Sequence, residues 1–408
     1  MNLSKTEGRT LIFFFLGLSS AIYWNIGVQI VFIEIVSVIA SFVAVFSNRK
    51  SMIQAEFNSE ITWIMRLFWV WLLTQTIIDL YRSAEFLESI KTFSSIFTLI
   101  ALLYCSKLFF LHSPVNLTAF LLGYIVSCTP SYIFFPTEYA RTQPWKFCFG
   151  INATLFVFWM LQKYRIRTLG FMGSSLVLVT IDLYTNSRSL AMLTTLSALS
   201  VLYSKSSFSR HPLIFVLLVI SILTYGEKLF LQFSSSGIFG TAVQTKTFAQ
   251  AQTGPILLVA RSEFLYEATA INSNWIFGSG SNPTVGTEVL NEVWRLESEL
   301  GINSKATAAF TQLGNSERLP QHSMLFTAWV EGGILSALVW LYMFKLFISW
   351  LLRQGIQSSE FEYVLSFMLV SMIWASLFSP LGTGSRLALV LTVIIGTVCN
   401  PSKKRAEL

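Results

Sequence analysis

One histidine stands where a polar segment enters a long apolar run, in the stretch QHSMLFTAWVEGG at residues 321–333. An imidazole exchanges protons near neutral pH, which makes His322 a candidate general base. The only other histidines are His112 and His211. The alternative interpretation is that His322 anchors the start of a helix at a membrane surface, and its position alone leaves both interpretations open.

Three arginines stand near the ends of apolar runs: Arg188 in YTNSRSLAML, Arg261 in LLVARSEFLYEA and Arg386 in GTGSRLAL. A guanidinium group matches phosphate oxygens through two parallel hydrogen bonds, so each arginine is a candidate anion-binding residue. The competing interpretations are headgroup contacts for Arg188 and Arg386, and a salt bridge for Arg261. Glu263 and Glu267 are badly spaced for that bridge within one helix. We therefore expect Arg261 to reach beyond its own helix.

Two glutamates lie within apolar runs. Glu331 follows His322 by nine residues, which places it about 13 Å deeper if the segment is one helix. That distance is too long for Glu331 to orient the imidazole directly. Because an unpaired charge in lipid costs several kcal/mol, Glu331 and Glu34 are expected to face the protein interior. Glu331 and Arg386 are therefore accessory candidates.

Several kinds of chemistry are excluded. Asp79 and Asp182 are the only aspartates, so no DxD pair is present to hold a metal–sugar-nucleotide. No P-loop is present, and GSGSNP at 278–283 lacks the third glycine of a dinucleotide site. The four cysteines lie in or beside apolar runs without CxxC spacing, which favours buried thiols over a metal or redox site. We expect no metal and no cofactor.

The composition indicates which elements must position these side chains. The 408 residues are 53% hydrophobic and 12% charged, whereas soluble domains carry about 25% charged residues. We predict an all-α, polytopic membrane protein, with the first two spans in a tight hairpin around NIG. The twelve apolar segments lie at 10–24, 26–47, 61–80, 90–111, 115–135, 147–162, 169–185, 188–204, 213–230, 323–352, 362–379 and 384–400.

Charge distribution predicts the orientation. Connections on one side carry fourteen Lys and Arg, against six in the short loops opposite, so the first side should be cytoplasmic with both termini. This bias explains the net charge of +7 better than nucleic-acid binding does. The chain then divides into nine spans at 1–230, a large external loop at 231–321, and three spans with a basic tail at 322–408. Amphipathic helices are predicted in the loop, at 256–276 and 285–300.

Three segments in register resemble the O-antigen ligase and O-antigen polymerase superfamily. They are SRSLAML, RSEFLYEATAINSNWIFGSGSN and PQHSMLFTAWVEGGILSALVWLY, in this order over residues 180–345. The layout of about twelve spans with one large loop also fits. Two departures occur: the proline often found before the L-F-G position is absent, and serine occupies the second glycine position in EGGILSAL.

The resemblance implies transfer of a polysaccharide from undecaprenyl pyrophosphate to an acceptor hydroxyl, at the periplasmic face of a bacterial inner membrane. The large loop would then be periplasmic. Arg188 and Arg261 would bind the pyrophosphate, and His322 would act at the acceptor hydroxyl or the leaving group. Guanidinium groups neutralise a departing diphosphate without a metal. Attack opposite the leaving group would invert the anomeric centre.

The first choice of function is a ligase whose acceptor is lipid A–core. The close alternative is a polymerase that extends the growing glycan on the same carrier, and a protein O-oligosaccharyltransferase is a lesser one. A transporter or flippase is the alternative outside enzymes. It would be expected to show broken helices or paired repeats around a midplane site. The candidate polar residues gather instead at the outer surface.

Overall fold

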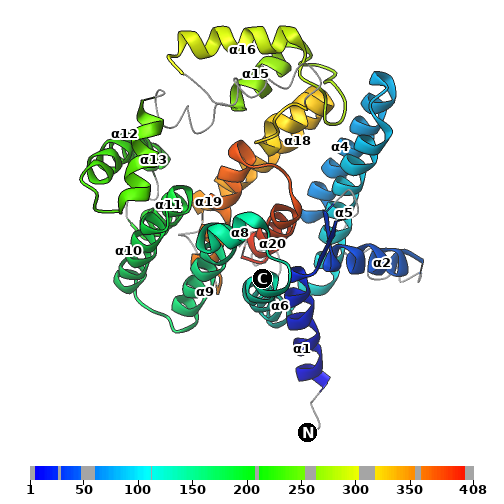
Figure 1. The fold of residues 1–408 in the computed structure, drawn as a ribbon. Coiled ribbons are helices and arrows are strands. Elements are labelled where there is room, and N and C mark those ends of the chain that lie inside the picture. Colours follow the sequence, from blue (N-terminus) through cyan, green and yellow to red (C-terminus); the bar gives the residue numbers. More distant parts are fainter. Residues whose placement is uncertain are drawn as a thin grey trace.

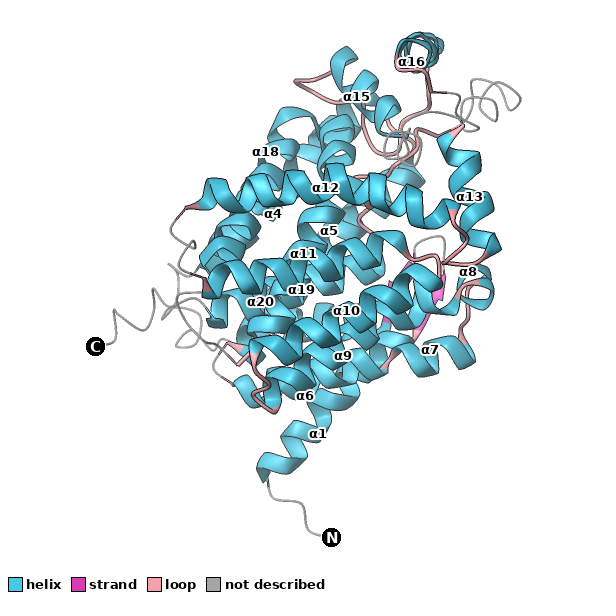
Figure 2. Cartoon of the chain, turned by 90° about the vertical axis from the view of Figure 1, so that its left-hand side faces the viewer, coloured by secondary structure: helices cyan, strands magenta, loops and turns pink. Residues whose placement is uncertain are grey.

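The computed structural model of the chain describes residues 5–25, 29–46, 60–111, 113–206, 211–252, 263–302, 318–353 and 360–399. Helices dominate, and one short two-stranded sheet accompanies them (Figure 2). An all-helical bundle is expected, because a backbone in hydrocarbon must satisfy its own hydrogen bonds.

Among the described residues, five helical segments are long and apolar enough to cross a membrane. They are α4 (Glu60–Arg82), α5 (Phe86–Phe110), α6 with α7 (Pro114–Val126 and Cys128–Phe134), α12 (Pro212–Ser235) and α18 (Met324–Arg353). Four shorter apolar helices are α2 (Phe32–Phe46), α10 (Thr168–Tyr184), α19 (Glu362–Phe378) and α20 (Thr383–Cys399). Helices α1 (Lys5–Leu18), α9 (Gly150–Lys163) and α11 (Arg188–Lys205) coincide with further apolar segments. The chain is thus helical with several membrane-compatible helices, and the number of crossings stays a prediction.

The connection between the first two segments differs from the expected one. Strands β1 (Tyr23–Asn25) and β2 (Gln29–Val31) pair antiparallel, so helix α2 begins only at Phe32. Ile30 and Val31 are β-branched and suit a strand. The Glu34 carboxylate accepts a hydrogen bond from the Val31 N–H at 2.9 Å, where strand gives way to helix.

The helices pack around α19, which contacts α11, α18 and α20. Helix α18 also contacts α4, and α5 contacts both α4 and α20. In Figure 1, α18 runs between α4 and α5 on the right and the helices from α10 to α12 on the left. Helix α1 crosses α6 closely, and Gly17 and Gly123 allow this approach. A Cβ on either glycine would clash with the backbone of the facing helix.

Three helices of the predicted external loop are described: α13 (Thr241–Ala251), α15 (Glu263–Ser273) and α16 (Thr287–Glu299). Helices α15 and α16 gather at the upper end of the bundle in Figure 1. Helix α16 matches the amphipathic helix predicted at 285–300, and α15 matches the second part of the helix predicted at 256–276. Residues 256–262 lie outside the described residues. Helix α13 was not predicted, because TAVQTKTFAQA has no strong apolar periodicity.

Helix α18 is interrupted at Gly333, so the continuous span predicted at 323–352 is wrong in this detail. Gly333 has φ 67° and ψ −164°, a backbone conformation that is essentially restricted to glycine. The loop segment at 276–280 docks at the break. The Ile334 N–H donates to the Ile276 carbonyl at 3.1 Å, and the Gly280 N–H donates to the Glu331 carbonyl at 3.0 Å. Backbone groups that the interrupted helix cannot pair are thus satisfied by the loop.

We expect Gly333→Ala to destabilise the protein strongly. A Cβ there would lie 2.1 Å from the Ile276 carbonyl oxygen, and the conformation itself costs about 1–3 kcal/mol for other residues. The measurement is the thermal midpoint of the purified protein in detergent. The matched control is Gly173→Ala in α10, where nothing lies within 4 Å and helix propensity favours alanine by up to ~1 kcal/mol. Equal midpoints for the two variants would contradict the role given to the break.

Candidate functional site

His322 lies just before α18 begins, against helix α15, and its side chain is 42% exposed. Its Nε2 lies 4.0 Å from Oε1 of Glu263, and its backbone N–H donates to Oε1 of Glu267 at 3.2 Å. The neighbouring Ser323 is buried and caps the helix, because its Oγ accepts from the Phe326 N–H at 3.1 Å. The helix mouth therefore holds the imidazole beside the Glu263 carboxylate, while Glu267 fixes the backbone of the same residue.

Glu267 joins the loop to the start of α18. Its Oε1 also accepts from the Thr327 hydroxyl at 2.7 Å, while its Oε2 is buried and has no hydrogen-bond partner among the described residues. The side chain is only 1% exposed, and this burial raises the pKa of Glu267 to about 7. A carboxyl group that changes charge near neutral pH thus lies directly behind His322.

A cavity of about 270 Å³, called here the polar cavity, lies beside α18 on the side of α4 and α5. Glu331 lines it and is 5% exposed, so it faces the protein interior as expected. Its Oε1 accepts from the Asn282 N–H at 2.8 Å and from Gln321 Nε2 at 2.6 Å. Opposite, Glu88 accepts from Lys91 Nζ at 2.8 Å and from Asn282 Nδ2 at 2.9 Å.

The separation expected between His322 and Glu331 rested on one continuous helix. The chain at 318–323 is not helical, and it folds back so that Gln321 reaches Glu331. Pro283 and Leu319 fix this path, because the Leu319 N–H donates to the Pro283 carbonyl at 2.8 Å. Glu331 is therefore linked to the residue next to His322 by one hydrogen bond.

Arg188 begins helix α11 and is partly buried. Its Nη2 donates to the Thr247 hydroxyl of α13 at 2.8 Å, and its guanidinium group lies 4.7 Å from the ring centre of Phe230 in α12. Thr247 also lines a cavity of about 250 Å³ between α12 and α13. The guanidinium group is thus positioned by an aromatic ring and by the hydroxyl of a residue that lines this cavity.

Arg261, the second arginine assigned to an anion by the resemblance, lies outside the described residues. It precedes Glu263 by two residues in the sequence. Its expected contact beyond its own helix stays a prediction.

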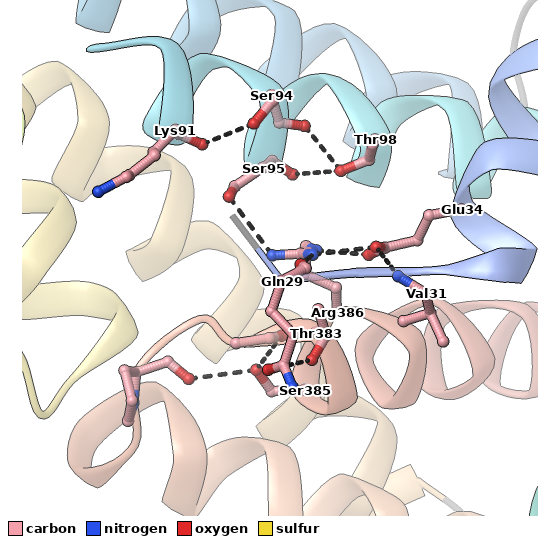
Figure 3. Close-up of polar contacts among 12 residues, drawn as sticks. Gln29, Val31, Glu34, Lys91, Ser94, Ser95, Thr98, Thr383, Ser385 and Arg386 are labelled. Carbon is pink, nitrogen blue, oxygen red and sulfur yellow. Dashed lines mark hydrogen bonds and ion pairs between the residues drawn. The ribbon is translucent and has the colours of Figure 1, made fainter. Parts of the chain in front are cut away.

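Arg386 has a different environment from the one expected of an anion-binding or headgroup-contacting arginine. It is 3% exposed and pairs with Glu34, with Nε 2.6 Å from Oε1 and Nη2 3.1 Å from Oε2 (Figure 3). It also donates to the Gln29 carbonyl and to the Ser95 hydroxyl. Arg386 therefore joins α20 to the β-hairpin, α2 and α5, and its charge is compensated within the protein.

Sequence reasoning did not single out the residues that surround His322 and Glu331. Gln321 and Asn282 lie in quoted motifs, but nothing in those motifs indicates which carboxylate each amide contacts. Glu88 and Lys91 could have been noticed as an ion pair at i,i+3 near the start of a span. Glu267 was weighed only as a partner for Arg261.

Comparisons of the chain with protein-family models, with curated proteins and with solved structures find no significant match.

We expect Glu267→Gln to change how stability depends on pH. The folded pKa of Glu267 is about 7, above the ordinary value of 4.5, so the folded state keeps a proton that the unfolded state has released. The native protein therefore loses stability as pH rises from about 4.5 to about 7, and then levels off. Glutamine is neutral throughout and lacks this loss. Thermal midpoints between pH 5 and pH 8 should fall more steeply for the native protein than for the variant, and parallel curves would exclude this protonation change.

Proposed function

We propose that the chain is an O-antigen ligase-like transferase, acting at the periplasmic face of a bacterial inner membrane. It would move a polysaccharide from undecaprenyl pyrophosphate to a hydroxyl of lipid A–core. The observation that supports this most is the packing of residues 263–282 against residues 321–334. These are the parts of two motifs that resemble the superfamily, and they are far apart in the sequence. Their packing sets a half-exposed histidine at the mouth of a helix beside the external loop.

The hydrogen bonds between the two segments are numerous and continuous. The His322 N–H and the Thr327 hydroxyl bond to Glu267, and Trp329 Nε1 donates to the Trp275 carbonyl at 2.9 Å. The Ser279 N–H then donates to the Val330 carbonyl at 2.7 Å. Motif glycines take part directly, since a Cβ at Gly278 would lie 2.5 Å from the Glu331 carbonyl oxygen. The residues of the two motifs therefore pack against each other, in addition to any chemical role that they have.

In the proposed reaction, His322 takes the proton of the acceptor hydroxyl as that oxygen attacks the anomeric carbon. The Glu263 carboxylate, whose Oε1 lies 4.0 Å from His322 Nε2, is close enough to attract the positive charge that forms on the ring during transfer. The bond from the anomeric carbon to the pyrophosphate oxygen breaks, and the carrier diphosphate leaves with the electron pair. Arg188 and Arg261 would neutralise this developing charge through charge-assisted hydrogen bonds.

A broken helix such as α18 is a feature expected of transporters. The break lies about 14 Å from the first residue of the helix, and a segment of the external loop fills it. This arrangement supports a role in docking the loop, because the break carries structural hydrogen bonds to residues 276–280. It therefore does not favour transport over transfer.

A deletion strain separates the ligase from the polymerase by its surface glycan. Loss of all glycan-bearing lipid A–core, with long carrier-linked chains retained, would identify a ligase. Lipid A–core that carries a single repeat would identify the polymerase instead. Carrier-linked glycan accumulating on the cytoplasmic side would contradict both and favour a flippase.

We expect His322→Gln to lose transfer, because an amide cannot take the proton. General-base catalysis typically contributes about 10²–10⁴ in rate. The measurement is transfer by purified protein from polyprenyl-pyrophosphate-linked glycan to lipid A–core. The control is His211→Gln, because His211 is exposed just before α12 and is distant from His322 in the sequence. If His322→Gln keeps most of the native rate, His322 only positions substrate and another group is the base.

We expect Arg188→Lys to lower the transfer rate by about 10²–10³, as loss of one contact to a developing anion does. A lysine ammonium cannot form the planar pair of hydrogen bonds that a guanidinium group gives to a diphosphate. The control is Arg295→Lys on the exposed face of α16, where arginine pairs with Glu292 and Glu299. Native turnover by the well-expressed Arg188→Lys protein would remove Arg188 from the pyrophosphate site.

A further inference from the structure

We propose that the polar cavity binds an uncharged sugar ring of the acceptor and presents its hydroxyl toward His322. This inference rests on the proposed function and adds to it a site for one substrate. The cavity is lined by residues from five parts of the chain. They are Trp71, Glu88, Lys91, Thr92, Ser95, Ile96, Asn282, Gln321, Met324, Thr327, Ala328, Glu331, Pro380, Leu381 and Gly382.

The charges of the cavity disfavour an anionic ligand. Among the described residues that line the cavity, Lys91 is the one cationic side chain, and it already pairs with Glu88 at 2.8 Å. Glu331 adds a second carboxylate with no cation in the lining left to balance it. Arg386 lies behind Ser95 and is neutralised by Glu34. A diphosphate would therefore meet repulsion here, whereas a hydroxyl group can donate to a carboxylate or an amide oxygen.

The shape and polarity of the cavity suit a single ring. Its volume of about 270 Å³ lies just below the range of small-molecule sites, about 300–1,000 Å³, and suits one ring. The lining combines hydroxyl, amide and carboxylate groups with apolar side chains of Trp71, Ile96 and Met324. Trp71 is 4% exposed, and its indole N–H has no hydrogen-bond partner among the described residues. A buried donor of this kind calls for a bound water or ligand group nearby.

The position of the cavity relates it to the proposed base. Gln321 lines the cavity and directly precedes His322, and Thr327 lines it while donating to Glu267 behind His322. The cavity lies on the α4 and α5 side of α18, whereas Arg188 lies with α11, α12 and α13 on the other side (Figure 1). Acceptor hydroxyl and carrier diphosphate would thus approach the anomeric carbon from opposite sides, as inversion requires.

The test separates the Michaelis constants of acceptor and donor. Thr92→Phe places a ring in the cavity, and Glu88→Gln removes a carboxylate with little change of shape. We expect each to raise the KM for lipid A–core on the order of tenfold or more, with the KM for the polyprenyl-linked donor nearly unchanged. The matched control is Ile90→Phe, which adds a ring at a position of the same helix that is 43% exposed. A rise in the donor KM instead would overturn the assignment to the acceptor.

A binding measurement keeps this inference separate from the proposed function. Saturation-transfer NMR of the native protein with glucose, galactose, N-acetylglucosamine and a heptose should show binding that Thr92→Phe abolishes. If the native protein transfers no glycan but shows this binding, the proposed function fails and the sugar site stands. If transfer occurs while both cavity variants keep the native acceptor KM and sugar binding, the cavity assignment fails alone. Should Thr92→Phe not fold, by its thermal midpoint, Glu88→Gln decides the question.

Discussion

The candidate site depends on one constraint: backbone groups freed by the break in α18 must be paired inside an apolar protein. An unpaired peptide group in hydrocarbon costs several kcal/mol, so a break at Gly333 persists only if other backbone fills it. Residues 276–280 do so, and their glycines allow the close approach. Once this segment is docked, Asn282 reaches Glu331, and α15 lies against the start of α18. The position of His322 therefore depends on the pairing of backbone groups at Gly333, eleven residues further along the chain.

The ionisable groups around this junction divide according to how their charge is compensated. Arg386 and Glu34 neutralise each other in a buried pair, and removal of one partner from such a pair typically costs 3–5 kcal/mol. Glu88 and Lys91 form a similar pair with more exposure. Oε1 of Glu267 accepts two hydrogen bonds, whereas its buried Oε2 has no partner among the described residues. Burial raises the pKa of Glu267 to about 7. The Arg386–Glu34 pair joins α20 to α2, whereas Glu267, whose carboxyl changes charge near neutral pH, accepts the backbone N–H of the proposed base.

The sequence predicts the elements well where hydropathy decides them, since the described helices follow the apolar segments. It fails where a tertiary contact decides the backbone. The β-hairpin and the break at Gly333 both exchange helical hydrogen bonds for bonds to another segment, and no local periodicity reports such a partner. The same limit applies to the site. His322 and Arg188 could be chosen because their types and positions are unusual, but the pairing of Arg386 with Glu34 joins residues 352 positions apart.

The boundary position of His322 reconciles two requirements of the proposed transfer. A histidine in hydrocarbon would be held neutral by desolvation and could not keep the proton that it removes. A histidine in open water would face a well-solvated hydroxyl and would gain little from fixed geometry. At the mouth of α18 the His322 side chain is 42% exposed, and its Nε2 lies 4.0 Å from the Glu263 carboxylate. The imidazole has this intermediate environment because the loop is hydrogen-bonded to α18 at its break. The first part of the helix thereby holds the loop beside His322.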